Sequence, residues 1–391
     1  MKTAQAGNGI AAAASRRQWL FGLAAATTIA RAQQPITIPG KQSMLVHNDQ
    51  PEDLETPLAR YETWLTPNDV FFVRQHLPRP QVNENTYALS LQGRVTKPLQ
   101  LSLAELRKLP QQTVAATLEC TGNARGFFRP RVPGIQWGRG AIGNAEWSGP
   151  RLSDVLKLAG SNVDSAYVTF NGADNGVAKT PDFIRSMPMS KALHPATLLA
   201  LRMNGDVLPE LHGFPVRLIV PGWDGTSWVK WVTSISVADQ ADAGFFMMPA
   251  YRFPEHPVPP GGAANPEDLK VIEGMPVKSF ITSPEDQQQI KPGPSIVKGI
   301  AWAGEERITS VAVSTDGGIR WSEAELSPQN LPFAWRLWTY KWQPPQPGYY
   351  TILSRATDSA GHVQPLVATW NPSGYLYSAI DKIGVTVEKS S

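Results

Sequence analysis

The sequence predicts an α+β domain followed by an all-β sandwich, and three observations support this class. Short apolar runs that suit strands alternate with short helical patterns between residues 69 and 237. A segment dense in proline and glycine, residues 253–266, then interrupts the pattern. Beyond it, strand-like runs alternate with turn signals, and no long helical pattern occurs. A mixed region followed by strands alone indicates two domains of different class.

The first 32 residues differ from the rest of the chain. Arg16 and Arg17 precede an apolar run that begins at Trp19, and a small-residue cleavage pattern ends at Ala32. This order of features resembles a bacterial twin-arginine export signal, which we favour over a frayed alanine-rich helix. The apolar run is shorter than the roughly 20 residues that a bilayer span needs. We therefore expect residues 1–32 to be removed, leaving a periplasmic mature chain without a membrane span.

Composition limits the classes to which this chain can belong. Hydrophobic residues make up 42% and charged residues 18% of its 391 residues, which is typical of a globular protein. Residues 1–32 carry four of the 36 basic residues and none of the 33 acidic ones, so the mature chain has a net charge near −1. This balance argues against nucleic-acid binding. The single cysteine, Cys120, excludes an internal disulfide, a thiolate-held iron–sulfur cluster and a C-x-x-C-H haem site.

The first domain is expected to span residues 33–264. Its opening part is polar and rich in proline, without a sustained period, and it is interpreted as an extended arm up to about residue 68. Strand-like and helical runs then alternate. The strand-like runs are residues 87–93, 166–170 and 216–221, and the helical patterns are residues 103–109 and 152–158.

The second domain is expected to span residues 265–391. Proline and glycine rarely support the interior of a regular element, so the segment before it is interpreted as a linker. Turn signals separate the strand-like runs, and an Asp-Gly-Gly hairpin signal occurs at residues 316–318. The even spacing predicts an all-β sandwich. Its expected strands are residues 295–302, 309–314, 320–324, 335–342, 350–358 and 383–388.

Cys120 allows three interpretations. Composition alone favours a buried structural cysteine, because free cysteine is among the most buried residue types. A nucleophile would need a base, and no local pattern resembles a cysteine-hydrolase motif. A metal ligand is the third possibility, but the six histidines are scattered and form no recognisable pair. A single thiolate could therefore hold a metal only if an organic cofactor supplied the other ligands.

The segment Cys120-Thr-Gly-Asn-Ala-Arg125 resembles the Cys-x-Gly-Asn-x-Arg signature of the sulfite oxidase family of molybdenum enzymes. Further segments resemble the family in the same order along nearly the whole mature chain. The run that follows the signature, residues 129–138, is closest to bacterial sulfite dehydrogenases. The other matching segments are residues 71–78, 172–174, 203–209, 212–222, 228–231 and 314–321.

The resemblance implies a fold and a cofactor. The first domain would bind molybdopterin, and the second would be an immunoglobulin-like dimerisation domain. Cys120 would be the one protein ligand of molybdenum, beside the dithiolene of a single pyranopterin. The family's pterin-contacting positions fall on His76, Asp174, His212, Arg217 and Lys230.

The resemblance also implies a substrate site. Sulfite is a dianion, and guanidinium groups match oxyanions well. Arg74 and Arg125 match the family's anion-binding arginines, and Tyr251 falls where the family has an active-site tyrosine. Ser373 stands where animal enzymes carry an arginine, which puts substrate affinity and identity in doubt more than cofactor binding.

The expected reaction is oxidation of sulfite to sulfate by oxygen-atom transfer at molybdenum. Electrons would pass to a cytochrome c or a haem subunit, in a homodimer or a heterodimer. Alternatives of the same fold are a sulfane-sulfur dehydrogenase and a sulfoxide reductase. A secreted two-domain binding protein with a structural Cys120 is the non-enzyme alternative.

Overall fold

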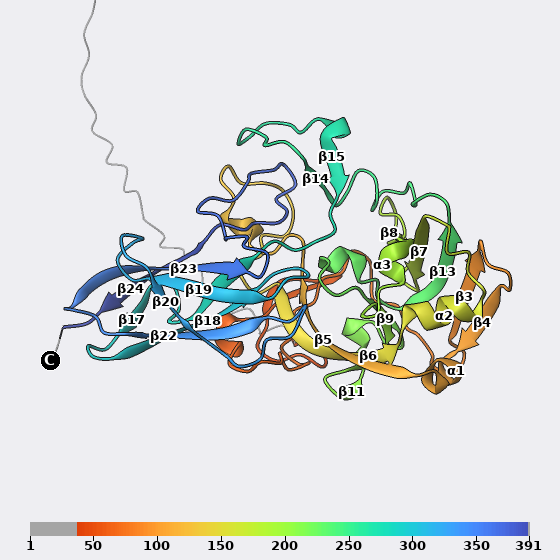
Figure 1. Ribbon diagram of the computed structural model, residues 1–391, viewed down its shortest axis with the longest axis horizontal. Helices are drawn as coiled ribbons and strands as arrows, with labels where there is room; N and C mark the ends of the chain where they lie inside the picture. The colour runs from red at the N-terminus through yellow and green to blue at the C-terminus, as the bar shows by residue number, and fades with distance from the viewer. Residues whose placement is uncertain (1–36, 390–391) are drawn as a thin grey trace, which may run out of the picture. The chain divides into compact units, whose positions relative to one another are not determined.

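The structure, a computed structural model, describes residues 37–389. Its first part contains both helices and strands, and its last part contains strands (Figure 1). Its three α-helices all precede residue 193, whereas the described residues from Leu269 onward form strands and no helix. This confirms the predicted α+β region followed by an all-β sandwich. The predicted export signal, residues 1–32, lies outside the described residues. Among residues 37–389, no helix is both long and apolar enough to cross a bilayer.

A five-stranded mixed sheet forms one part of the first region, in the order β4-β3-β13-β7-β8. β13 runs parallel to β3, and the other neighbouring pairs are antiparallel. Alternate residues of β3 and β7 are buried, which is the period expected for a half-buried strand. The strands are β3 (Ala88–Gly93), β4 (Leu99–Ser102), β7 (Tyr167–Gly172), β8 (Arg185–Pro188) and β13 (Val232–Ala238).

The helices match the predicted patterns closely. α1 (Leu103–Lys108) and α2 (Leu152–Leu158) fall on the two predicted helical runs, and α3 (Met189–Ala192) adds one short turn beside β7 and β8. Ser102 begins α1 with a capping box, because its hydroxyl accepts from the Glu105 amide while the Glu105 carboxylate accepts from the Ser102 amide.

A second sheet, in the order β11-β10-β6-β5, leads directly into the turn that contains Cys120. β5 (Gln111–Glu119) and β6 (Ile142–Pro150) pair antiparallel over their whole lengths, from Gln111 opposite Pro150 to Glu119 opposite Ile142. β10 (Arg202–Met203) and β11 (Asp206–Val207) extend this sheet. Because β5 ends at Glu119, Cys120 is the first residue of the turn that follows.

The arm differs from its prediction. The segment up to about residue 68 was expected to be an extended arm without a sustained period, but β1 (Leu45–Asp49) and β2 (Glu52–Glu55) pair as a hairpin there. Every residue of β2 is buried, because its charged side chains have partners within the fold, as in the hydrogen bonds from the Gly138 and Gly140 amides to Glu55. Two smaller pairs complete the first region and the linker: β9 (Leu198–Ala200) with β12 (Arg217–Ile219), and β14 (Arg252–Pro254) with β15 (Leu269–Val271).

The second region consists of two packed sheets. One sheet has the order β16-β18-β22-β21 and the other β17-β24-β23-β19-β20. Buried valine, isoleucine and tryptophan side chains of both sheets share one core, as in other β-sandwiches. The strands are β16 (Lys278–Ser283), β17 (Gln288–Ile290), β18 (Ser295–Trp302), β19 (Ile308–Ser314), β20 (Ser322–Glu323), β21 (Glu325–Leu326), β22 (Arg336–Trp342), β23 (Gly348–Asp358) and β24 (Asp381–Val387).

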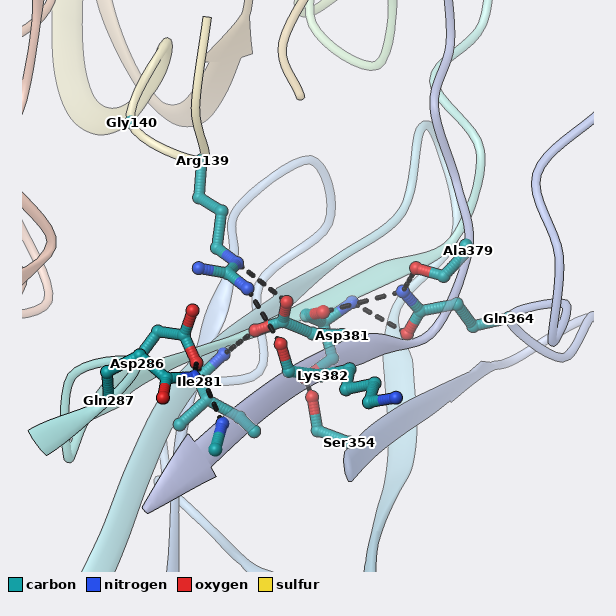
Figure 2. A network of polar contacts seen from close by, with 12 residues as sticks. Arg139, Gly140, Ile281, Asp286, Gln287, Ser354, Gln364, Ala379, Asp381 and Lys382 are labelled. Carbon is teal, nitrogen blue, oxygen red and sulfur yellow. Dashed lines mark hydrogen bonds and ion pairs between the residues drawn. The ribbon is translucent and has the colours of Figure 1, made fainter. Parts of the chain in front are cut away.

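Polar contacts join the two regions. Figure 2 shows Arg139, from the loop between β5 and β6, paired with Asp381 at the start of β24. The Arg139 Nε atom lies 2.6 Å from Asp381 Oδ1, and the other carboxylate oxygen accepts from the Ile281 amide at 2.7 Å. Both side chains are largely buried. The first region and the sandwich are therefore in direct, hydrogen-bonded contact.

Candidate functional site

One cavity brings together residues that are far apart in the sequence. It opens to solvent, and its empty space, open solvent included, is about 670 Å³. Segments 72–76 and 118–121 contribute to its wall, together with residues from the loops around positions 174, 212 and 230. Eight of the nine predicted site residues line it: Arg74, His76, Cys120, Asp174, His212, Arg217, Lys230 and Tyr251.

The turn after β5 holds Cys120 in the cavity wall. The Cys120 amide donates to the Ala141 carbonyl at 2.9 Å, and its own carbonyl accepts from the Asn123 amide at 2.8 Å. A Cβ atom at Gly122 would lie 2.6 Å from a guanidinium nitrogen of Arg125, so a larger residue here would displace that arginine. Burial raises the pKa of the Cys120 thiol, and the nearby Arg74 and Arg125 oppose that effect. Cys120, Gly122 and Arg125 thus occur at fixed spacing because they pack together in one turn.

The two predicted anion-binding arginines are placed differently. The Arg74 Nη1 atom donates to Asp53 Oδ1 at 3.0 Å, and its side chain lines the cavity. Arg125 is buried and does not line the cavity. Its Nε atom donates to the Gly374 carbonyl at 3.2 Å, and its guanidinium lies 5.3 Å from the Tyr375 ring centroid. Arg125 therefore acts on the cavity through its charge and through the loop it supports.

Tyr251 and His76 form a hydrogen-bonded pair in the wall. The His76 Nε2 atom contacts the Tyr251 hydroxyl, and the His76 ring stacks on Phe183 with centroids 4.8 Å apart. Burial lowers the pKa of His76 well below its usual value, with a further contribution from Arg74. Burial also raises the pKa of Tyr251. The pair is therefore a neutral imidazole beside a protonated phenol.

Two buried cations face the same cavity. Burial lowers the pKa of Arg217 to about 9 and lowers the pKa of Lys230 well below its usual value, with Arg217 adding to the effect on Lys230. The Lys230 Nζ atom donates to the Arg74 and Leu211 carbonyls at 3.2 and 3.4 Å. Burial raises the pKa of Asp174 to about 6, although Lys230 opposes this shift. The protein carries a positive charge here that its own carboxylates only partly balance.

His212 has a partner that sequence reasoning missed. The Lys41 Nζ atom lies 2.7 Å from His212 Nε2 and also donates to the Asn68 and Phe71 carbonyls at 2.7 Å. Burial lowers the pKa of Lys41 to about 7 and that of His212 well below its usual value. Lys41 belongs to the arm, where no period or motif marked it. Only the fold reveals the pair, because 171 positions separate the two residues.

Several buried polar atoms of the wall lack a protein partner. They are Arg217 Nε, Asp174 Oδ1, and the side-chain nitrogen and oxygen of Gln75. A buried polar group without a hydrogen bond costs free energy, so such a group on a cavity wall points to a bound polar ligand. A pyranopterin with a phosphate offers acceptors for Arg217 and donors for Asp174. The residues present therefore fit this cofactor.

The side chains that could ligate a metal are also compatible with this cofactor. Among residues 37–389, no three His, Cys, Asp or Glu side chains are grouped closely enough to hold a metal ion. Cys120 is the thiol of this wall, and a metal bound to it would take its remaining ligands from a cofactor. A dithiolene would provide them.

Ser373 lies in a loop of the second region that reaches the site. The Asn371 side chain orders this loop, with Nδ2 donating to the Tyr375 carbonyl at 2.9 Å and Oδ1 accepting from the Tyr375 amide at 3.0 Å. Ser373 does not line the cavity. Instead the Tyr375 ring stacks on Tyr251, with centroids 5.3 Å apart and an angle of 22°. The loop thus places an aromatic ring, and no arginine, beside the predicted active-site tyrosine.

The chain is similar to known molybdenum proteins over both regions. Residues 76–246 match the family described as the oxidoreductase molybdopterin binding domain, and residues 269–388 match the Mo-co oxidoreductase dimerisation domain. Mitochondrial sulfite oxidase of Mus musculus is 36% identical over 372 residues, which cover 91% of this chain and 67% of the mouse protein. Sulfite oxidase of Arabidopsis thaliana is 34% identical over 381 residues, covering 90% and 95%.

A solved structure has the same fold. The sulfane dehydrogenase SoxCD of Paracoccus pantotrophus superposes with a TM-score of 0.75 and 29% sequence identity, covering 96% of this chain and 98% of that chain. The similarity thus extends over both regions.

Proposed function

Because the chain belongs to the sulfite oxidase family of molybdenum oxidoreductases, we propose that it oxidises sulfite to sulfate and that a separate cytochrome c accepts the electrons. The observation that supports this proposal is the position of Cys120 in one cavity wall with Arg74, Arg217 and Lys230. A lone thiol among cations suits a thiolate-bound metal with an anionic cofactor and an anionic substrate.

Each predicted cofactor contact has a physical role in this proposal. Cys120 would hold the metal, and the buried cations Arg217 and Lys230 would bind the pyranopterin phosphate. Asp174 and His212 would form hydrogen bonds with the pterin ring, as acceptors or as donors. Bound there, the molybdenum cofactor supplies two-electron oxygen-atom-transfer chemistry, which side chains alone do not provide.

The substrate would bind beside Arg74. Asp53 orients the guanidinium through its hydrogen bond, so the positive charge faces the cavity before the dianion arrives. Tyr251 would donate its phenolic proton to a sulfite oxygen without adding charge. A neutral His76 that donates its Nε2–H to the phenol oxygen would hold Tyr251 in place and leave the phenolic proton free for sulfite. Arg125, behind the wall, would add long-range attraction and no direct contact.

The remaining parts of the proposal concern partners and location. A single cysteine excludes a C-x-x-C-H haem site in this chain, so the electrons would leave to a separate acceptor. Residues 1–32 resemble a twin-arginine signal, which supports a periplasmic location and hence a cytochrome c acceptor. The match to a dimerisation domain over residues 269–388 supports a dimer.

A sulfane-sulfur dehydrogenase is the second candidate. The fold of the Paracoccus sulfane dehydrogenase covers 96% of this chain. The Tyr251 ring, stacked on Tyr375, also gives the cavity wall a neutral aromatic part, which a larger sulfur substrate could contact. Rates with sulfite and with a protein-bound persulfide, measured on the same molybdenum-containing preparation, separate the two candidates.

Substituting the predicted metal ligand tests the proposal. We expect Cys120→Ser, expressed in a host that makes molybdopterin, to lose molybdenum and to lower sulfite-dependent cytochrome c reduction by more than about 100-fold. The wild-type protein should carry about one molybdenum per chain. Thr113→Ala is the matched control, because it removes a hydroxyl from the exposed start of the same strand, β5. A Cys120→Ser protein that keeps both metal and turnover would refute the assignment.

A further inference from the structure

The end of β5 has two faces with different partners. Leu118 and Cys120 line the cavity. The side chains of Thr117 and Glu119 instead bond to the second region, which follows from the alternation of residues along a strand. Thr121, just beyond the strand, lines the cavity too, but its carbonyl bonds to the second region. The Thr117 hydroxyl accepts from the Trp335 amide at 2.9 Å, and the Thr121 carbonyl accepts from the Leu376 amide at 2.9 Å. The strand that presents the thiol is therefore held from behind by the sandwich.

Glu119 makes the strongest of these contacts. Its Oε1 atom lies 2.7 Å from Lys278 Nζ, and its Oε2 atom accepts from Trp302 Nε1 at 2.9 Å. Lys278 begins β16 and Trp302 ends β18, and the two residues face each other across these paired strands. The side chains of Lys278 and Glu119 are only 1% and 2% exposed. This is a fully desolvated ion pair whose partners lie 159 positions apart.

Glu119 is linked to the thiol turn by a second route. The Asn123 side chain donates to Glu119 Oε1 at 3.1 Å and accepts from the Ala141 amide at 3.1 Å. The backbone amide of Asn123 donates to the Cys120 carbonyl at 2.8 Å. A shift of the Glu119 carboxylate would therefore act on Cys120 by two routes: directly through the adjoining backbone, and through Asn123, whose backbone amide bonds to the Cys120 carbonyl.

We propose that Lys278, a residue of the second region, is a positioning residue for Cys120 and acts through Glu119. The pair fixes the end of β5, so the position and orientation of the thiol depend on a cation of the sandwich. The proposal rests on the proposed role of Cys120 as the metal ligand. It gives the second region a part in the active site that goes beyond dimerisation.

The test compares three variants of the full-length protein, purified with molybdenum. Glu119→Gln combined with Lys278→Met removes both charges together and leaves no bare charge in the core. Trp302→Phe removes the N–H donor and part of the ring but introduces no unpaired charge, so it tests the same contact by a second route. Arg139→Met is the control, because it removes a buried ion pair between the same two regions that does not involve β5 (Figure 2).

We expect the double variant to keep its molybdenum while the electron paramagnetic resonance signal of Mo(V) shifts. Its kcat should fall by about tenfold with KM within about twofold, as is typical when a residue that orients a metal ligand is removed. Trp302→Phe should change the signal in the same direction and by less. Arg139→Met should leave the signal and kcat at wild-type values.

An unchanged Mo(V) signal in both the double variant and Trp302→Phe would overturn this inference and leave the proposed function intact. Wild-type protein without molybdenum would instead overturn the proposed function, and this inference with it. A double variant that folds but loses its molybdenum, beside a control that retains it, would support the positioning role.

Discussion

The buried basic residues of the cavity wall have opposite effects on stability and on cofactor binding. Arg217 and Lys230 are buried without a carboxylate that fully balances them, which costs stability in the cofactor-free chain. The same charges would attract an anionic cofactor. A wall of this kind gains stability when its ligand binds, which is a common property of binding sites.

Lys230→Met makes this conflict measurable. Burial lowers the pKa of Lys230 in the folded chain, whereas in the unfolded chain it is about 10.5. At any pH between these two pKa values, the unfolded chain binds more protons than the folded chain, and stability therefore increases with pH. Stability of the cofactor-free wild type should therefore rise as the pH increases above 7. The variant lacks that rise, so it should be more stable at pH 7, by about 1 kcal/mol, with the difference shrinking toward pH 10.

Urea unfolding of the cofactor-free proteins at several pH values gives the free energies of unfolding. Molybdenum analysis of protein from a competent host should show lower occupancy in Lys230→Met. Equal pH dependence in the two proteins would contradict the assigned direction of the pKa shift.

The site residues that could be predicted from the sequence are those inside short motifs. Cys120, Gly122 and Arg125 occur in one turn, so their spacing is visible. Lys41, Asp53 and Lys278 could not be predicted, because each meets its partner only after the chain has folded and carries no local signal. Arg125 shows a further limit. A motif fixes the residue type but not the direction of the side chain, which here points to Gly374 and away from the cavity.

Among the elements, the helices follow their local signals and the short strands do not. α1 and α2 have apolar residues at helical spacing, and α1 also has a capping box, so their bounds match the predicted patterns closely. The hairpin of β1 and β2 has no such pattern, because β2 is buried on both faces and carries three acidic residues. Its formation depends on long-range partners such as Arg74 and the Gly138 amide.

The capping box of α1 predicts a small and specific effect. We expect Ser102→Ala to lower the free energy of unfolding by about 1 kcal/mol, because the Glu105 amide loses its acceptor. Urea titration monitored by circular dichroism measures this change. Glu105→Gln keeps an acceptor for the Ser102 amide and should change stability less. A larger loss for Glu105→Gln than for Ser102→Ala would show that charge, and not capping, stabilises this end.

At the scale of the whole molecule, the two regions share buried ionic contacts. Glu119 with Lys278, and Arg139 with Asp381, both cross from the first region to the sandwich. The sequence predicted two domains and a linker, and the fold class is confirmed. The boundary at residue 265 stays a prediction. Composition and turn signals could not show how closely the regions interact.

These contacts predict cooperative unfolding. Urea transitions followed by tryptophan fluorescence and by far-ultraviolet circular dichroism should coincide, because neither region keeps its buried charges paired without the other. Lys278→Met should lower the free energy of unfolding by about 3 kcal/mol, since it leaves the Glu119 carboxylate buried and alone. Two separate transitions in the wild type would contradict this coupling.

The loop that carries Tyr375 also sets an order of events during synthesis. Tyr375 stacks on Tyr251 and its neighbour Gly374 holds Arg125, yet both are made about 255 positions after Cys120. At translation speeds of about 5–20 residues per second, the ribosome needs roughly 10 to 50 seconds to produce them. For that interval the nascent chain displays its thiol without the loop beside it, so this wall can reach its final form only late in translation.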